Sequence, residues 1–492
     1  MVAEPFGIPL RQAKAPLILA LDIGTSGLRA LAFDSLARPI RTAGVSSDRA
    51  PRLSTRGEAS LDPAERSRAA FACIDRVMGA LGRRGADVAA VSVSAFWHSL
   101  MGVDAQARPT TRVITWADTR PRGAAAVLRR ELDEEAVHAR TGCMLHASYF
   151  PAKLRWLGGA EPDSYRATAH WMSFGEYLYL RVFGERRAAH GMASATGLYT
   201  QSGGTWDAPM LGALALDERT LSPISDDALQ GLRPTFARRW PALARVPWIP
   251  AIGDGACSNL GTGGTGAATA TLTVGTSAAI RVIREVVPPT VRGGWTYRLD
   301  QQRIIAGGAL SNGGNAISWV ERIFPSVDLA RLARRPVDAH GLTALPLLAG
   351  DRSPTWDDAA RGTVAGLTLG TSQEDIAQAF LEGIVLRFGR LWDLVDAALP
   401  GIERVVVSGG VALSRPYVTQ LLADTLGKPL IASGVREGSA RGAAIVALER
   451  IGAIEDLTAA AAPLGRTFRP RMRVHEVMRM ALVRQAALEG GS

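Results

Sequence analysis

Cysteine is scarce in this sequence, and its few cysteines stand apart. The 492 residues contain three, Cys73, Cys143 and Cys257, and no two of them form a C-x-x-C pair. Disulfide-stabilised secreted domains are dense in cysteine, and structural zinc sites hold their cysteines at close spacing. We therefore expect three ordinary packed thiols, with neither a disulfide framework nor a zinc site.

Long hydrophobic runs are also missing. Although 47% of the residues are hydrophobic, no uninterrupted apolar run approaches the roughly 20 residues that a membrane-spanning helix needs. The apolar stretch after Lys14 ends at Asp22, which makes it too short for a signal peptide. These absences predict a globular protein with no membrane partner and a cytoplasmic location.

Lysine is nearly absent. Only Lys14, Lys153 and Lys428 contribute to the 56 basic residues, and arginine supplies the others. The formal net charge of +10 would suit a nucleic-acid partner if the basic residues were clustered. They are instead dispersed among acidic residues, so we expect no nucleic-acid partner. The positive surplus would still favour an anionic small-molecule substrate.

The phosphate-binding motif of P-loop proteins does not occur either. There is no G-x-x-x-x-G-K-[ST] sequence, and none of the three lysines follows a glycine-rich loop. Residues 261–266 match G-x-G-x-x-G literally, but they lead into an expected strand, whereas a dinucleotide-binding fold requires a helix there. We interpret this segment as a flexible connection between domains.

What the sequence does contain is a repeated hairpin pattern. Residues 17–21 form an apolar run of strand length, residues 22–27 a glycine-rich turn, and the next apolar run continues to Phe33. Residues 270–283 repeat the pattern around a second turn, Gly275-Thr276-Ser277. A chain of this length suits two or three domains, and the repeat predicts two similar domains that face each other.

Elsewhere, expected strands and helices alternate, which predicts an α/β architecture. Strands are expected at residues 88–94 and 405–407, helices at residues 124–135, 375–394 and 417–426, and a closely packed helix with small residues at 437–444. The polar segment after residue 463 is weakly patterned, so we expect it to be peripheral.

The first turn carries groups that suit phosphate and metal binding. Its glycines allow close backbone approach, Thr25 and Ser26 add hydroxyl donors, and Asp22 at the strand end could hold Mg²⁺ through water. Taken alone, such a turn is more often simply a hairpin. Its recurrence at Gly275 and Thr276 favours a nucleotide-phosphate site built from both turns.

Four more side chains are candidates for chemistry on a substrate. Asp254 lies between two glycines just before the second hairpin, where a general base could approach a ligand, although an acidic turn residue has the same pattern. His98 follows an expected strand, where polar groups line ligand sites in α/β folds, although a single histidine is often structural. Asp118 and Arg120 could bind hydroxyls and a carboxylate, or Asp118 could cap a helix.

Together these motifs resemble the FGGY family of carbohydrate kinases, in the family's order over residues 17–450. The resemblance is carried by Leu19 to Ser26, Gly253-Asp254-Gly255, Val274 to Ser277, Gly307-Gly308-Ala309, Ser408-Gly409-Gly410 and residues 437–444. The segments that look most similar to the gluconokinase branch are Trp97 to Met101, Thr115 to Arg120 and Asp351 to Trp356.

The resemblance implies a fold, a domain division and cofactors. The implied fold is α/β, a duplicated actin-like, ribonuclease-H-like ATPase fold with two domains around a central cleft. Residues 16–256 would form a sugar-binding domain, residues 257–455 an ATP-binding domain and residues 456–492 a peripheral tail. ATP and Mg²⁺ are the implied cofactors, a small sugar or sugar acid is the implied partner, and a homodimer is compatible with this interpretation.

The resemblance also assigns roles to individual residues. Asp254 would be the catalytic base and contact the sugar, and Asp22 would organise Mg²⁺. The nucleotide would be held by Thr25, Ser26, Gly275, Thr276, Gly308, Gly409 and Gly410. The sugar would contact Trp97, His98 and Asp118, and we assign Arg120 to a substrate carboxylate.

The predicted reaction is ATP-dependent phosphorylation of a small sugar or sugar acid at a terminal hydroxyl, with gluconate to 6-phosphogluconate the favoured case. A xylulokinase or another pentulose or polyol kinase of the same family is the nearest alternative. An actin-like ATPase switch, in which ATP turnover drives partner binding, is the alternative from another class. The group formed by His98, Asp118 and Arg120 favours a kinase over a switch.

Overall fold

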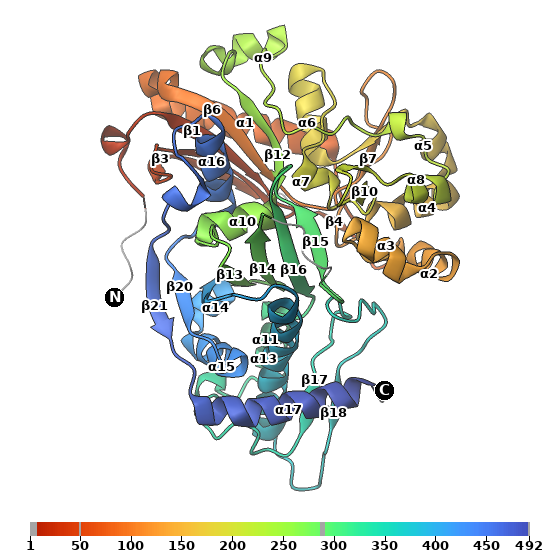
Figure 1. The fold of residues 1–492 in the computed structure, drawn as a ribbon, viewed down its shortest axis with the longest axis vertical. Helices are drawn as coiled ribbons and strands as arrows, with labels where there is room; N and C mark the ends of the chain where they lie inside the picture. The colour runs from red at the N-terminus through yellow and green to blue at the C-terminus, as the bar shows by residue number, and fades with distance from the viewer. Residues whose placement is uncertain (1–6, 49–50, 286–290, 491–492) are drawn as a thin grey trace.

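Two mixed β-sheets organise the chain (Figure 1). The computed structural model describes residues 7–48, 51–285 and 291–490. The first sheet has the strand order β12-β6-β1-β2-β3, in which β1, β2 and β3 are antiparallel and β6 and β12 run parallel to β1. Its strands are Leu17–Ile23 (β1), Gly27–Phe33 (β2), Pro39–Asp48 (β3), Val88–Ala95 (β6) and Trp248–Gly253 (β12).

The second sheet repeats this arrangement. Its order is β15-β16-β14-β13-β19-β20-β21, and from β16 to β20 three antiparallel strands are again followed by two parallel ones. Its strands are Thr269–Val274 (β13), Ala278–Arg284 (β14), Trp295–Arg298 (β15), Ile304–Leu310 (β16), Arg404–Ser408 (β19), Leu430–Ser433 (β20) and Leu464–Phe468 (β21). The predicted repeat is confirmed, because both hairpins open topologically equivalent sheets of a duplicated α/β fold.

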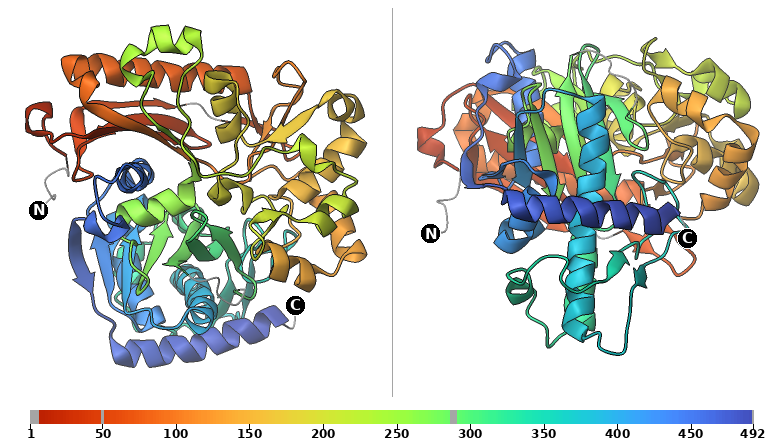
Figure 2. Two further views of the ribbon diagram at one scale, coloured as in Figure 1. Left: turned by 45° about the horizontal axis from the view of Figure 1, so that its top comes forward. Right: turned by 60° about the horizontal axis from the view of Figure 1, so that its bottom comes forward.

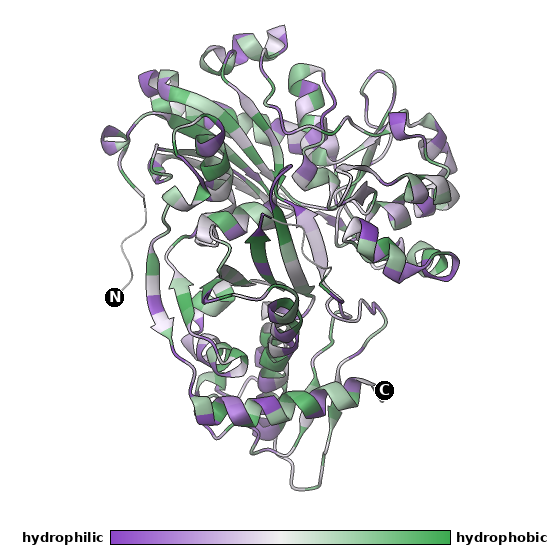
Figure 3. Cartoon of the chain, in the orientation of Figure 1, coloured by the Kyte–Doolittle hydropathy of each residue, from purple (hydrophilic) through white to green (hydrophobic). Residues whose placement is uncertain are grey.

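The strands of the first sheet are apolar because helices cover both faces (Figures 2 and 3). Helix α1 (Pro63–Leu81) lies on the outer face, and α16 (Gly438–Arg450) lies on the inner face. Helix α1 begins with its first backbone donors satisfied, since the Asp62 carboxylate accepts a hydrogen bond from the Glu65 N–H at 2.8 Å.

Helices α10 (Asp254–Thr262) and α16 cross between the two sheets (Figure 2). They approach so closely that glycine is required at the contact. A Cβ on Gly442 would overlap the backbone of Cys257, and a Cβ on Gly261 would overlap that of Gly438. The expectation that small residues allow close helix packing here is confirmed, and the crossing joins the two halves.

The buried Arg441 of α16 holds this crossing together. Its guanidinium donates to the carbonyl oxygens of Gly261 at 2.8 Å and Ala37 at 3.0 Å. It also donates to the carbonyl oxygens of Ala460 and Ala461, at 3.1 and 2.9 Å. One side chain thus connects a loop of the first half, the end of α10 and the segment that follows α16.

The first residues of the segment 261–266, which was predicted to be a flexible connection, are helical instead. Gly261 and Thr262 belong to α10, and Gly263 ends that helix in the left-handed conformation with φ 115°. The expected domain boundary between residues 256 and 257 also falls inside this helix. A continuous helix therefore carries the chain from the first sheet toward the second.

A largely helical insertion separates β6 from β12, and much of it packs around its own hydrophobic core (Figure 1). Its helices are Arg122–Glu131 (α2), Glu134–Thr141 (α3), Phe150–Ala160 (α4), Pro162–Ala167 (α5), Phe174–Phe183 (α6), His190–Ala193 (α7), Ala208–Ala213 (α8) and Pro234–Arg239 (α9). The single helix expected at residues 124–135 is divided in two, because the Asp133 carboxylate caps a new helix by accepting from the Ala136 N–H at 3.1 Å.

Short strands connect these elements at the edges of the molecule. They are Arg52–Leu53 (β4), Ala59–Leu61 (β5), Met101–Val103 (β7), Val113–Ile114 (β8), His170–Met172 (β9), Tyr199–Thr200 (β10), Thr205–Trp206 (β11), Thr343–Leu345 (β17) and Thr363–Ala365 (β18). None of the helices in the described part of the chain is both long enough and apolar enough to cross a membrane.

Further helices cover the outer face of the second sheet. They are Gly314–Ile323 (α11), Leu329–Leu332 (α12), Gln373–Ala398 (α13), Gly410–Ser414 (α14), Pro416–Leu426 (α15) and Met472–Gly490 (α17). The tail lies on the outside but is packed: β21 is an edge strand beside β20, and α17 lies against α13 and α15. Glu489 of α17 also pairs with the buried Arg387 at 2.9 Å, and Arg387 pairs with Asp351 at 2.8 Å.

The close crossing of α10 and α16 gives a stability prediction. Gly442→Ala should lower the free energy of unfolding by about 3 kcal/mol, because the added methyl group forces the helices apart. Gly79→Ala is the matched control, since Gly79 is an exposed helical position where a Cβ would meet no described atom within 4 Å. That variant should be stabilised slightly. Urea unfolding of both variants measures the effect, and equal stabilities would contradict the close crossing.

Candidate active site

The carboxyl ends of three parallel strands bring the main candidates together. Asp22 lies near the end of β1, and Asp254 comes directly after β12. Trp97 and His98 follow β6, which lies between those two strands, with Ser94 of β6 paired with Asp22. Because parallel strands end at the same edge of a sheet, side chains that are distant in the sequence meet there.

Asp22 and Asp254 are close enough for their charges to interact. The side chain of Asp22 is 13% exposed, and its Oδ1 accepts a hydrogen bond from Ser94 Oγ at 3.1 Å. Burial, and then the negative charge of Asp254, raise the pKa of Asp22 to about 6. Burial also raises the pKa of Asp254, and the positive charge of Arg281 opposes this rise. Such a pair of carboxylates favours binding of a cation or a proton.

Asp254 is the first residue of a helix rather than a turn residue between flexible glycines. The flanking glycines make room for an aromatic ring: a Cβ on Gly253 or Gly255 would overlap the indole of Trp97. The Asp254 carboxylate accepts a hydrogen bond from the Gly255 N–H at 2.8 Å, at the helix end that favours negative charge. Helix α10 and Trp97 together therefore set the position of Asp254.

Trp97 and His98 lie in an aromatic cluster that joins the two halves. Trp97 is buried, donates from Nε1 to Gly191 O at 3.0 Å, and packs 5.0 Å from the Tyr297 ring of β15. His98 contacts Tyr149 with ring centroids 4.9 Å apart. Burial, and then the charge of Lys153, lower the pKa of His98 to about 3, so its imidazole is neutral.

The hydrogen bonding of His98 fixes how it can meet a ligand. Its Nδ1 lies 2.7 Å from the carbonyl oxygen of Ala195, which can only accept, so Nδ1 carries the proton and donates. Nε2 of the neutral ring is then an acceptor for a hydroxyl group. The residue has a φ of 60°, which a histidine adopts only when its surroundings impose it.

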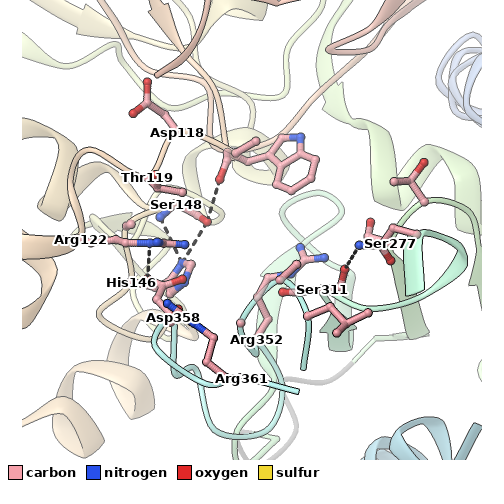
Figure 4. Close-up of a pocket in the computed structure, with 18 residues that line it drawn as sticks. Asp118, Thr119, Arg122, His146, Ser148, Ser277, Ser311, Arg352, Asp358 and Arg361 are labelled. Carbon is pink, nitrogen blue, oxygen red and sulfur yellow. Dashed lines mark hydrogen bonds and ion pairs between the residues drawn. The ribbon is translucent and has the colours of Figure 1, made fainter. Parts of the chain in front are cut away.

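Asp118 and Arg120 pair with each other. The Arg120 guanidinium donates to Asp118 Oδ2 at 2.7 Å and stacks 4.4 Å above the ring of Trp156. The Asp118 carboxylate is buried, also accepts from the Ala59 N–H at 3.1 Å, and points away from the cavity in Figure 4. Arg120 is thus held by Asp118 and Trp156 and does not line the cavity, whereas Asp118 is among the residues that line it. The assignments of Arg120 to a substrate carboxylate and of Asp118 to a sugar stay predictions.

The first hairpin turn, between β1 and β2, exposes the expected hydroxyl groups. Thr25 is partly exposed and Ser26 is exposed. The buried Arg66 of α1 supports the turn by donating to the carbonyl oxygens of Gly24 and Gly27. This support leaves both hydroxyl side chains accessible for phosphate oxygens.

The second hairpin turn, between β13 and β14, is held by the start of α11. The backbone N–H groups of Gly314 and Asn315, at the start of α11, donate to the carbonyl oxygens of Gly275 and Thr276 at 2.8 and 3.1 Å. The Thr276 side chain is exposed, and it lines the cavity together with Ser277.

The three other glycines that were predicted to hold the nucleotide differ in their surroundings. Gly308 is buried within β16, where a Cβ would meet Leu391 and Ser353, so it serves packing and lies away from both turns. Gly409 has a φ of 95° and approaches the backbone of Val274 closely. At Gly410, the first residue of α14, a Cβ would meet no described atom within 4 Å. Of the three, Gly410 alone offers open space for a ligand.

A cavity of about 550 Å³ lies between the two halves (Figure 4). The first half contributes Trp116 and His146, and the second contributes Thr276 and Arg352. His146 Nε2 lies 3.0 Å from Asp358 Oδ1, so a hydrogen bond links the two halves beside the cavity. The cavity is lined by polar groups of both halves, as a site for two polar substrates requires.

Two arginines near this site were not among the sequence-predicted site residues. Arg281 lies on β14, and Arg352 lines the cavity. Arg281 had a detectable signal, because a charged residue inside the otherwise apolar strand AAIRVIR is costly to bury without a function. Arg352 appeared in the sequence only as part of a segment typical of one family branch.

The raised pKa of Asp22 gives a prediction for stability. Its folded pKa of about 6 exceeds the ordinary value of 3.8, so ionised Asp22 destabilises the folded state at pH 7 by about 3 kcal/mol. This penalty falls as the pH drops through 6 and vanishes below about pH 4, where the group is protonated in both states. Asp22→Asn should therefore raise the free energy of unfolding at pH 7 by about 2 kcal/mol.

Urea unfolding at pH 7 and at about pH 4.5 measures this difference, which should shrink at the lower pH. Asp456→Asn is the control, because Asp456 is exposed and Thr458 lowers its pKa, so its substitution should not stabilise the protein. An Asp22→Asn variant that is less stable than the wild type at pH 7 would contradict the unfavourable burial of this carboxylate.

Comparisons with known proteins agree with this geometry. Residues 17–261 match the N-terminal domain of the FGGY family of carbohydrate kinases, and residues 270–449 match its C-terminal domain. A gluconokinase of Bacillus subtilis (strain 168) is 26% identical over 480 residues, which cover 92% of this chain and 91% of that protein.

Solved structures show the same fold. A xylulose kinase and a gluconate kinase, both from Lactobacillus acidophilus, superpose with a TM-score of 0.88 at 23% identity and cover 96% of this chain and 98% of their own. The two family matches together span the first sheet, the insertion and all strands of the second sheet except β21. The chain therefore belongs to the FGGY family of carbohydrate kinases.

Proposed function

We propose that this carbohydrate kinase is an ATP-dependent gluconokinase, which transfers the γ-phosphoryl group of ATP to the terminal hydroxyl of gluconate and forms 6-phosphogluconate. The observation that carries this proposal is the pair of carboxylates, Asp22 and Asp254, at the ends of two strands on either side of β6, where the two halves meet. The choice of gluconate is supported by curated relatives that are gluconokinases, at 26% identity over 92% of this chain.

In this mechanism Asp254 accepts the proton of the terminal hydroxyl as its oxygen attacks the γ-phosphorus in line. The raised pKa of Asp254, which burial causes, makes it a better proton acceptor near neutral pH than an ordinary aspartate. His98 accepts a hydrogen bond from another hydroxyl through Nε2, while Thr25 and Thr276 donate to phosphate oxygens. Positioning and electrostatic stabilisation carry the rate, since phosphoryl transfer needs little covalent chemistry from the protein.

Asp22 would hold Mg²⁺, and its surroundings fit this role. Its carboxylate is poorly solvated and lies near a second carboxylate, so a cation would favour its ionised form. The described residues contain no cluster of three or more His, Cys, Asp or Glu side chains that could hold a metal, so water and phosphate oxygens would supply the other ligands. Mg²⁺, when bound, neutralises charge on the phosphate oxygens.

The proposed base gives a direct prediction. The wild type should phosphorylate gluconate faster than xylulose or glycerol, and Asp254→Asn should lower kcat about 1000-fold, because the hydroxyl loses its proton acceptor. The variant should remain folded and bind ATP, since the amide retains the shape of the carboxylate. A coupled assay for ADP, together with ATP titration of the variant, measures both effects.

The outcomes separate the alternatives. Near-normal turnover of Asp254→Asn would end this mechanism. Activity on xylulose with none on gluconate would replace gluconokinase by a pentulose kinase. Sugar-independent ATP hydrolysis with no sugar phosphate formed would instead favour a nucleotide-driven switch.

Gly410 tests where the adenosine lies. Gly410→Val places its side chain in space that the described protein atoms leave open, so folding should be unaffected. If adenosine packs against this backbone, the KM for ATP should rise about 10-fold while the KM for the sugar stays within about 2-fold. Gly79→Val on α1 is the control for the effect of valine in an exposed helix, and equal KM values for ATP would place the adenosine elsewhere.

A further inference from the structure

Two arginines beside the cleft have buried N–H groups without partners. Nε and Nη1 of Arg281, and Nε of Arg352, are buried and make no hydrogen bond with any described residue. Neither guanidinium forms an ion pair in the described part of the chain, whereas Arg120 and Arg387 each pair with a carboxylate. Leaving charged donors buried and unsatisfied is costly, and beside a cleft a bound ligand is one way in which such groups are completed.

Arg281 projects from the second sheet toward the first half. On β14 its neighbours two residues away face the same side, and Ile283 belongs to the core of the first half. Ile280 and Val282, which face the other side of the strand, belong to the core of the second half. Nε of Arg281 lies 3.1 Å from where a Cβ on Gly255 would be, so the guanidinium sits beside the start of α10.

Arg352 lines the cavity and is labelled in Figure 4. Its guanidinium lies 5.4 Å from the ring of Trp116, and its Nη2 donates to Leu310 O at 3.1 Å. Burial lowers the pKa of Arg281 to about 10, and the charge of Arg352 adds to this effect. The charge of Arg352 also contributes, after burial and Lys153, to the lowered pKa of His98. The two guanidinium groups therefore lie around the space that His98 also faces.

The position of Arg281 along its strand separates it from the phosphate-binding turn. Arg281 comes five positions after Thr276 in the sequence, which corresponds to about 16 Å along an extended strand. A group there meets the acceptor substrate rather than the triphosphate. A guanidinium offers two parallel N–H donors, which match the two oxygens of a carboxylate.

We propose that Arg281, assisted by Arg352, binds the carboxylate of a sugar acid and so determines the preference of this kinase for an aldonic acid over a neutral polyol. This inference rests on the proposed function, because it assigns the acidic end of the substrate to these two side chains. Asp254 and His98 then meet the hydroxyl groups, and the cleft has opposite charges for the two ends of the substrate. Arg120, which pairs with Asp118, has no part in this recognition.

The test compares gluconate with glucitol, which has a hydroxymethyl group in place of the carboxylate. The wild type should prefer gluconate in kcat/KM by about 100-fold, as two charge-assisted hydrogen bonds provide. Arg281→Met should reduce the preference for gluconate over glucitol in kcat/KM to within about 3-fold, whatever its effect through Asp254 on the turnover of both substrates. Arg281→Lys and Arg352→Met should each lower the value for gluconate about 10-fold.

Arg284→Met is the matched control. Arg284 lies on the same strand but donates to the carbonyl oxygens of Leu399 and Pro400, both at 3.2 Å. The Arg284→Met variant should therefore leave the preference for gluconate over glucitol unchanged. If Arg281→Met does not fold, Arg281→Lys and Arg352→Met carry the comparison. The KM for ATP should stay within about 2-fold in every variant, and a matching rise in that KM would overturn the proposal by assigning the arginines to the nucleotide.

The remaining outcomes distinguish this inference from the proposed function. A wild type that phosphorylates gluconate, with a preference that survives Arg281→Met, would overturn the inference and leave gluconokinase intact. A wild type that ignores gluconate but phosphorylates another sugar acid in an Arg281-dependent way would support the inference and replace the substrate. Activity on neutral sugars alone would overturn both.

Discussion

The burial of two acidic side chains where the two halves meet is the constraint on which the rest of this structure depends. Asp22 and Asp254 lie where three parallel strands of the first sheet end, and burial raises the pKa of each. Their charges are moderated by Ser94, which donates to Asp22, and by Arg281, which lies beside Asp254. The same shortage of water that destabilises these carboxylates strengthens every electrostatic contact they make with a substrate.

The packing of the two halves explains how the acidic groups keep their positions. Asp254 is the first residue of α10, and α10 is held against α16 by glycines and by the four carbonyl contacts of Arg441. Any shift of this crossing moves Asp254 relative to the second sheet. The proposed base thus depends on backbone contacts at the far end of its own helix, which explains why small residues gather there.

Buried cations near the cleft fall into two groups. Arg66 supports the first turn through carbonyl oxygens, and Lys153, whose pKa burial lowers to about 7, donates to the carbonyl oxygen of His98. These side chains have protein partners and serve the shape of the site. Arg281 and Arg352 have buried N–H groups without a hydrogen bond and form no ion pair in the described part of the chain, and they lie near Asp254 and the cavity, which is the physical basis for assigning them to a ligand.

The sequence by itself determined the repeated hairpins, the α/β character and the accessible turns at Thr25 and Thr276, because strand periodicity and glycine turns depend on neighbouring residues. Closeness in sequence suggested a shared site for Asp118 and Arg120, and the same closeness lets their two charges pair with each other. Only the tertiary structure decided which groups meet, and which buried donors, such as those of Arg281, lack a partner in the described part of the chain. The reason is that burial and charge pairing are set by residues far apart in the chain.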